Sequence, residues 1–133
     1  MNRENILSKT TSYLALQKVF IDFCSLLKKN PSLSSDYGLQ VTDEIFFNSQ
    51  NILVLGNFVT LKFEYHNYND GIIGKIDIRS GEGIMHIIGT IYFDKLGNWK
   101  KNIDASNFQY NFARHDDFFV FILGCFFDKY YLE

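Results

Sequence analysis

The chain has 133 residues, of which 47% are hydrophobic and 21% are charged, and its formal net charge is −2. These values are typical of one globular domain and exclude a chain that is disordered throughout. With one proline and nine glycines there is no linker-like segment, so residues 1–133 are treated as a single domain.

Several features predict a cytoplasmic protein. The N-terminus shows no apolar segment followed by a small-residue cleavage site, so no secretory signal is expected. The longest apolar run, residues 118–127, is too short to cross a bilayer and is expected to form a buried helix. Cys24 and Cys125 lie within apolar stretches, which is typical of buried free thiols in a reducing compartment.

The first predicted element is an amphipathic helix over residues 6–29. Its apolar residues recur at steps of three and four, which places them on one face. They are Ile6, Tyr13, Leu16, Phe20, Phe23 and Leu27. Pro31 ends the helix, and the composition of residues 32–38 predicts a loop. A first strand, interrupted by two acidic residues, is expected over residues 39–47.

The rest of the chain predicts an antiparallel meander that is followed by a helix. Strands are expected at residues 52–66, 72–79 and 84–93, with weaker ones at 99–103 and 108–112. The last helix begins at His115 and is apolar almost all round, so it is expected to be heavily buried. The predicted fold is α+β: an N-terminal helix, a meander of about five strands and a C-terminal helix, with the helices on one face.

Charges predict the register of the first central hairpin. With Lys62 opposite Asp77 and Glu64 opposite Lys75, both pairs join opposite charges on the outer face of the sheet.

A four-residue turn in the next hairpin would place Asp77 opposite His86. An imidazole beside a carboxylate is a possible general base, but no nucleophile completes the group, and structural charge pairing is the favoured interpretation. The same register would place Gly74 opposite Gly89 and leave a notch, which could hold a side chain or a small ligand.

No motif indicates a metal or a cofactor. The spacing of the three histidines matches no metal signature. The glycine-containing loops lack the patterns that bind phosphates. No cofactor and no metal ligands are therefore expected, and no catalytic residues are assigned.

The charges are unevenly distributed along the chain. Residues 36–94 carry eight acidic and three basic side chains. A net acidic sheet disfavours nucleic acid, which needs clustered Lys and Arg, and suits a basic protein. The segment Lys95–Lys101, whose lysines flank Trp99, is the part of the chain where the sequence would allow weak nucleic-acid binding.

These observations favour a non-catalytic protein-binding domain, specifically a small bacterial immunity-type protein that neutralises a basic toxin. The expected contacts are Glu64, Asp77, Glu82 and His86. Two alternatives stay open: a domain that binds a hydrophobic small ligand, and an enzyme whose site residues are dispersed in the sequence.

Overall fold

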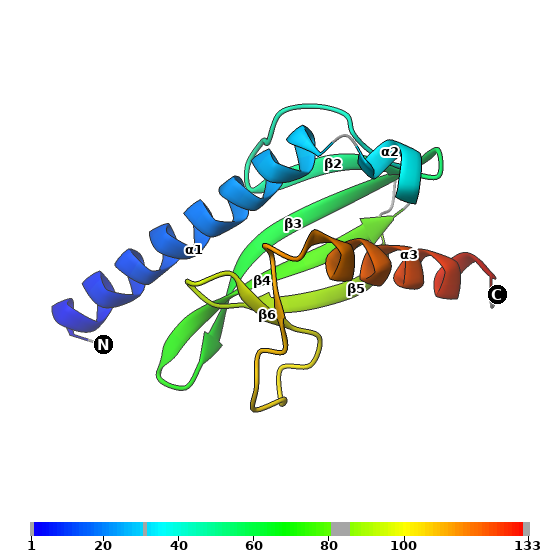
Figure 1. Cartoon of the computed structure of the whole chain (residues 1–133). Coiled ribbons are helices and arrows are strands. Elements are labelled where there is room, and N and C mark those ends of the chain that lie inside the picture. Colours follow the sequence, from blue (N-terminus) through cyan, green and yellow to red (C-terminus); the bar gives the residue numbers. More distant parts are fainter. Residues whose placement is uncertain (1, 31, 81–85, 132–133) are drawn as a thin grey trace.

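The computed structural model describes residues 2–30, 32–80 and 86–131, which form one curled antiparallel sheet with helices on its inner face (Figure 1). The helices are α1 (Arg3–Lys29), α2 (Ser32–Tyr37) and α3 (His115–Tyr131). The strands are β1 (Leu39–Val41), β2 (Ser49–Val54), β3 (Asn57–Tyr68), β4 (Gly71–Ser80), β5 (His86–Phe93), β6 (Asn98–Lys100) and β7 (Tyr110–Asn111). The α+β prediction is confirmed, with seven strands in the described part of the chain in place of about five.

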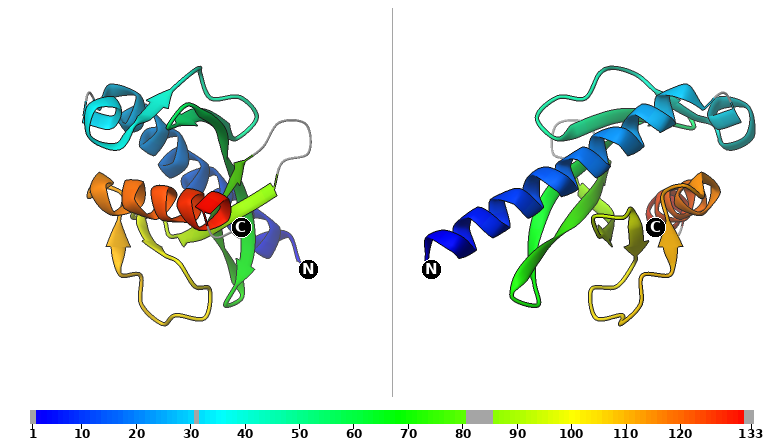
Figure 2. Two further views of the ribbon diagram at one scale, coloured as in Figure 1. Left: turned by 90° about the vertical axis from the view of Figure 1, so that its right-hand side faces the viewer. Right: turned by 60° about the vertical axis from the view of Figure 1, so that its left-hand side comes forward.

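Every strand pairs with its neighbours in the sequence, in the order β1 to β7, so the sheet is a meander as predicted. The long strands β3 and β4 form its centre, and the two views of Figure 2 show how the sheet curls around α1 and α3. Every connection between consecutive strands is too short for the crossover that parallel neighbours need, so neighbouring strands run antiparallel.

The prediction of one strand over residues 52–66 is wrong, because a hairpin divides it. Val54 pairs with Asn57, and Leu55 and Gly56 make the turn between them with φ values of 51° and 82°. Two central residues with positive φ are typical of a type I′ turn, whose twist matches the strands that it joins. A leucine rarely adopts this conformation, so the alternation of apolar residues concealed the turn.

The loop prediction for residues 32–38 is also wrong, since most of this segment forms α2. Its last residue, Tyr37, packs against Phe119 of α3 with ring centroids 5.2 Å apart. A hydrogen bond to Asp116, more than burial or the nearby negative charges, raises the pKa of Tyr37. Tertiary contacts thus stabilise a helix that its composition alone does not favour.

The register predicted for the first central hairpin is confirmed, because Lys62 lies opposite Asp77 and Glu64 opposite Lys75. The register predicted for the second hairpin is wrong. Asp77 lies opposite Thr90, and His86 lies opposite Ser80.

The second hairpin differs for two reasons. Its pairing ends at Ser80 and His86, so the connection is longer than the four residues assumed. A β-bulge between Ile78 and Arg79 then shifts the register by one residue.

The two glycines therefore do not face each other, and the predicted notch is absent. Gly74 lies opposite Phe93, whose ring occupies the space where a Cβ would stand, at 2.3 Å. Gly89 lies against α3, where a Cβ would stand 2.5 Å from the Cys125 sulfur. Each glycine allows a close approach that a larger residue would prevent.

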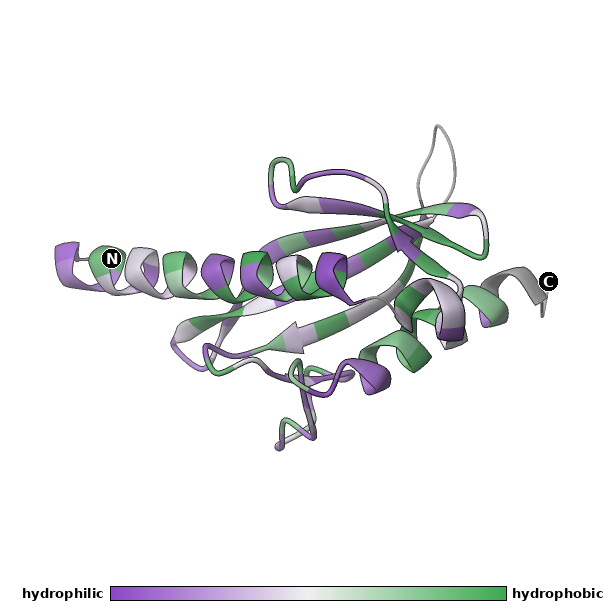
Figure 3. Cartoon of the chain, turned by 45° about the horizontal axis from the view of Figure 1, so that its top comes forward, coloured by the Kyte–Doolittle hydropathy of each residue, from purple (hydrophilic) through white to green (hydrophobic). Residues whose placement is uncertain are grey.

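The predicted apolar face of α1 is confirmed over its C-terminal half. Leu16, Phe20, Phe23 and Leu27 are buried. Ile6, at the other end, is 51% exposed because α1 extends past the core. Apolar positions continue into this projecting half of α1 (Figure 3).

Helix α3 begins at His115, as predicted, but it is buried on one side only. Phe118, Phe119 and Ile122 are buried against the core, whereas Val120 is 61% exposed. The expected heavy burial of this helix therefore holds for one face and not for the other. None of the helices in the described residues is long and apolar enough to span a membrane.

The loop between β6 and β7 buries a lysine against the outer face of the sheet. The Lys100 ammonium donates to the Ala105 carbonyl (2.6 Å) and the Tyr68 hydroxyl (3.0 Å), and it lies 4.6 Å from the ring centres of Tyr68 and Phe108. These hydrogen bonds and cation–π contacts stabilise the buried ammonium, a role that a carboxylate often has in proteins. Trp99 is fully buried as well, so neither residue offers a platform for stacking bases.

Phe23 provides a test of the core. Its ring stacks on Phe112 at 4.3 Å and meets Phe118 edge to face at 4.8 Å. Phe23→Ala should lower the free energy of unfolding by about 3–5 kcal/mol, because the cavity cannot fully close. Leu14→Ala, on the exposed side of the same helix, should change it by less than about 0.5 kcal/mol. Urea unfolding measures both, and equal losses would contradict the assignment of the buried face.

Candidate partner-binding surface

The residues expected to contact a partner lie in different settings. Glu64 and Asp77 are neighbours on the outer face of β3 and β4, and His86 is exposed at the start of β5. Glu82 lies outside the described residues. The structure therefore brings together Glu64 and Asp77 but places His86 opposite Ser80.

Asp77 is buried in a charged cluster and does not face solvent. It is 2% exposed, and its carboxylate accepts a hydrogen bond from the Thr90 hydroxyl at 2.9 Å. Arg79 and Lys75 lie 3.4 Å and 3.8 Å from the same carboxylate. Glu64, on the exposed side of the cluster, contacts the same two cations at 3.4 Å and 3.3 Å.

Two carboxylates and two cations therefore neutralise one another in this cluster, and Glu64 is its more accessible acid. Lys62 does not join it. Its ammonium donates instead to the backbone carbonyl of Phe47 at 2.7 Å, on the side of β3 that faces β2 and away from the cluster. The charges that support the predicted register thus act mainly within the sheet.

The largest exposed aromatic side chains of the β1–β2 connection are Phe46 and Phe47, which are 69% and 78% exposed. Their ring centroids lie 4.3 Å apart. This pair and the residues that hold it, residues 46–49, are called the aromatic turn. Two adjacent phenylalanines in water are unfavourable unless a partner covers them.

Backbone hydrogen bonds close the aromatic turn tightly. Phe46 and Ser49 exchange two of them, each 2.9 Å long. Phe47 and Asn48, the central residues, have φ values of 47° and 60°. Phenylalanine rarely adopts this left-handed conformation, so the surroundings must hold it there.

Asn48 supplies the attachment. Its side-chain amide donates to the Tyr13 hydroxyl and accepts from the Gln17 amide, both at 2.8 Å. Its backbone carbonyl accepts the N–H of Phe63 at 2.8 Å. The aromatic turn is thus fixed to both α1 and β3, and its rings are held on a rigid support.

Acidic side chains flank the aromatic turn. Asp43 and Glu44 are exposed just before it. Asp43 accepts a hydrogen bond from Asn51, and Glu44 forms an ion pair with Lys28 at the end of α1. The exposed aromatic pair is thus flanked by the Asp43 carboxylate and the Glu44–Lys28 ion pair, with the Lys62 ammonium bonded to the turn itself.

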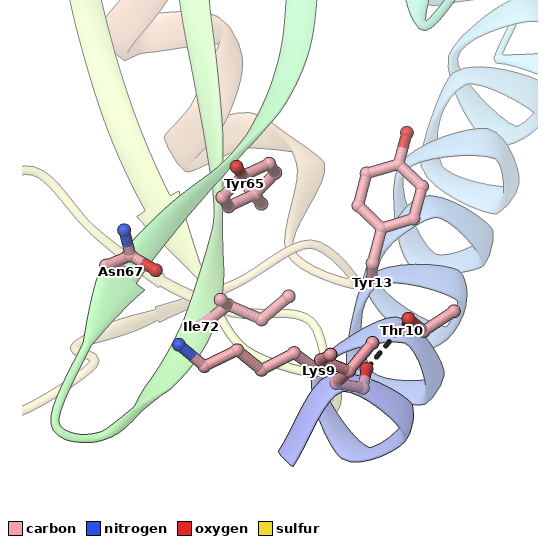
Figure 4. A pocket seen from close by; sticks show the side chains of 7 residues that line it. Lys9, Thr10, Tyr13, Tyr65, Asn67 and Ile72 are labelled. Carbon is pink, nitrogen blue, oxygen red and sulfur yellow. Dashed lines mark hydrogen bonds between the residues drawn. The ribbon is translucent and has the colours of Figure 1, made fainter. Parts of the chain in front are cut away.

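An open cleft lies nearby, where the projecting half of α1 passes the β3–β4 hairpin (Figure 4). Its volume is about 500 Å³. Ile6, Lys9 and Tyr13 line it from α1, and Tyr65, Asn67 and Ile72 line it from the sheet. The rings of Tyr13 and Tyr65 meet edge to face at 6.3 Å.

The cysteines are unsuited to nucleophilic chemistry. Both are free, as predicted, although Cys125 is only half-buried. Desolvation by burial raises the pKa of Cys24 to about 12 and is the main cause that raises that of Cys125 to about 11. Both thiols are therefore protonated near neutral pH. In the part of the chain that the structure describes, no group of three His, Cys, Asp or Glu side chains could hold a metal ion.

Comparisons with protein-family models, with curated proteins and with solved structures gave no match for this chain.

The aromatic turn differs from the strand predicted over residues 39–47, which includes Phe47. A signal was present: Phe-Phe is followed by Asn-Ser, and asparagine readily adopts positive φ. The alternation of apolar residues, which is typical of a strand, masks this turn signal.

A pair of variants distinguishes the roles of the two clustered carboxylates. Asp77→Ala should lower the free energy of unfolding by about 2 kcal/mol, because it leaves buried partners without a carboxylate. Glu64→Ala should cost less than about 1 kcal/mol, since its ion pairs are exposed to water. Thermal and urea unfolding check both values. Equal costs would show that the burial of Asp77 does not govern the cluster.

Proposed function

We propose that this chain is a non-catalytic protein-binding domain of the immunity type, which binds a basic protein toxin and blocks it. The observation that carries the proposal is the aromatic turn, in which Phe46 and Phe47 are exposed on a turn fixed to two elements of the fold.

The energetics of interfaces favour such a feature. Binding hot spots are aromatic and lie in the centre of an interface, where the partner excludes water. A side chain that is already held in place loses little conformational freedom on binding. Phe46 and Phe47 are aromatic and exposed, and the backbone that carries them is held by two hydrogen bonds and anchored through Asn48, so a partner that covered them would gain apolar contact without ordering the turn.

Charge supports a basic partner. Asp43 and Glu44 precede the aromatic turn, and Glu64 is the half-exposed acid of the charged cluster. Carboxylates at the rim of an interface speed association with a cation-rich surface, and salt weakens this effect. Asp77 is too deeply buried to contact a partner directly, so we propose that it stabilises the part of the sheet that carries Glu64.

A hydrophobic ligand is the second candidate, because the cleft between α1 and the β3–β4 hairpin is lined by Ile6, Tyr13, Tyr65 and Ile72. This cleft is open to solvent, whereas small-ligand sites bury most of the ligand surface. The exposed aromatic pair has no role in that alternative. We therefore favour a protein partner.

The test uses the double variant Phe46→Ser, Phe47→Ser. The partner is first captured from the native host with the wild-type chain, and its affinity is then measured by calorimetry. The double variant should bind at least about 30-fold more weakly, the effect expected when a hot spot is lost. Co-expression with the toxin should no longer restore growth.

The matched control is Leu96→Ser. Leu96 is 80% exposed in another turn of the sheet and should be replaceable without effect. Unchanged affinity in the phenylalanine double variant, or a partner that is acidic, would contradict the proposal.

A further inference from the structure

Strand β3 has a free edge over its second half. It pairs with β4 as far as Tyr68, but its register with β2 ends where Lys62 meets Ser49. The aromatic turn carries the chain away at this point. Among the described residues, the segment from Phe63 to Tyr68 therefore has a neighbouring strand on one side only.

The β2–β3 hairpin determines which backbone groups face this edge. Because a two-residue turn joins Val54 to Asn57, these residues form a hydrogen-bonded pair, and every second residue of β3 from Asn57 onward points toward β2. The N–H of Phe63, which belongs to this set, donates to the Asn48 carbonyl. The next members of the set are Tyr65 and Asn67.

The β3–β4 hairpin leads to the same assignment. A two-residue turn joins Tyr68 to Gly71, so the even-numbered residues of β3 point toward β4. Tyr65 and Asn67 thus direct their N–H and C=O groups away from β4. In the described part of the chain, no backbone hydrogen bond from outside the sheet reaches them.

A groove runs along this edge. It has a volume of about 750 Å³ and is lined by every residue of β3 from Lys62 to Asn67, together with Asn48 and Tyr13. It shares Tyr13, Tyr65 and Asn67 with the cleft shown in Figure 4. Its floor is therefore the strand edge itself, with α1 along one side.

The two sides of the groove differ in chemistry. Toward α1 it opens into the cleft lined by Ile6, Tyr13 and Ile72. On the outer face it is lined by Lys62, Glu64 and His66. A strand in the groove would direct alternate side chains to these two sides.

We propose that this edge binds an extended segment of the partner protein, which adds to the sheet as a strand beside residues 64–68 of β3. The free N–H and C=O groups of Tyr65 and Asn67 require donors and acceptors at the spacing of a peptide backbone. The segment is about five residues long and alternates apolar side chains, directed toward α1, with polar ones. This inference rests on the proposed protein-binding function and adds the mode of recognition.

The experiment uses a displayed library of random peptides, selected on the wild-type chain. Peptides that are enriched should shift the backbone NMR signals of Tyr65 and Asn67. Methylation of peptide backbone nitrogens should weaken binding about tenfold or more at alternate positions and have little effect between them, because only alternate amides point to the edge.

A pair of variants at one position provides the matched control. Asn67→Pro removes an N–H that faces the groove and leaves the ladder to β4 intact, so the chain should fold and bind the peptide at least about tenfold more weakly. Asn67→Ala keeps the N–H and should bind as the wild type does. Unfolding curves establish that both variants are folded.

Failure to enrich any peptide would overturn the inference, as would tolerance of methylation at every position. A concentration-dependent dimer that shifts the same signals would assign the edge to a second copy of the chain. If the peptide experiments fail but the double phenylalanine variant still loses the partner, strand addition is contradicted and the protein-binding function is supported. If that variant binds normally, the proposed function itself fails.

Discussion

The side chain of Asn48 donates to Tyr13 and accepts from Gln17, while its backbone carbonyl accepts the N–H of Phe63. These contacts join α1 to β3 at the point where β2 stops pairing. Asparagine tolerates the positive φ of this position, whereas the preceding Phe47 adopts it at a cost of roughly 1–3 kcal/mol. Because the strained turn exists only while its surroundings hold it, the anchoring by Asn48 determines how the chain leaves the sheet.

Two features follow from this change of direction. The aromatic pair is carried out into solvent, and the remaining half of β3 is left without a second neighbour. Lys62 reinforces the junction through its hydrogen bond to Phe47. Proteins usually cover or shorten an exposed edge because it can pair with another chain. An uncovered edge beside an exposed aromatic pair is consistent with one continuous binding surface.

The sequence predicted the parts of the fold that depend on periodic patterns. The apolar face of α1 and the register of β3 with β4 follow from the spacing of residues such as Phe20 and Glu64, since burial and charge pairing act on these patterns directly. The turns at Leu55 and Phe47 could not be predicted in this way, because tertiary contacts hold bulky residues at positive φ. The register shift between β4 and β5 at Ile78 and Arg79 likewise has no local signal in the sequence.

Amide hydrogen exchange, followed residue by residue by NMR in the free protein, measures the state of the β3 edge most directly. The amide of Phe63, bonded to Asn48, and those of Glu64 and His66, directed toward β4, should be protected. The amides of Tyr65 and Asn67 should exchange orders of magnitude faster, giving fast and slow exchange at alternate residues. Protection of Tyr65 and Asn67 equal to that of Phe63 would show that the edge is already paired and would contradict the account.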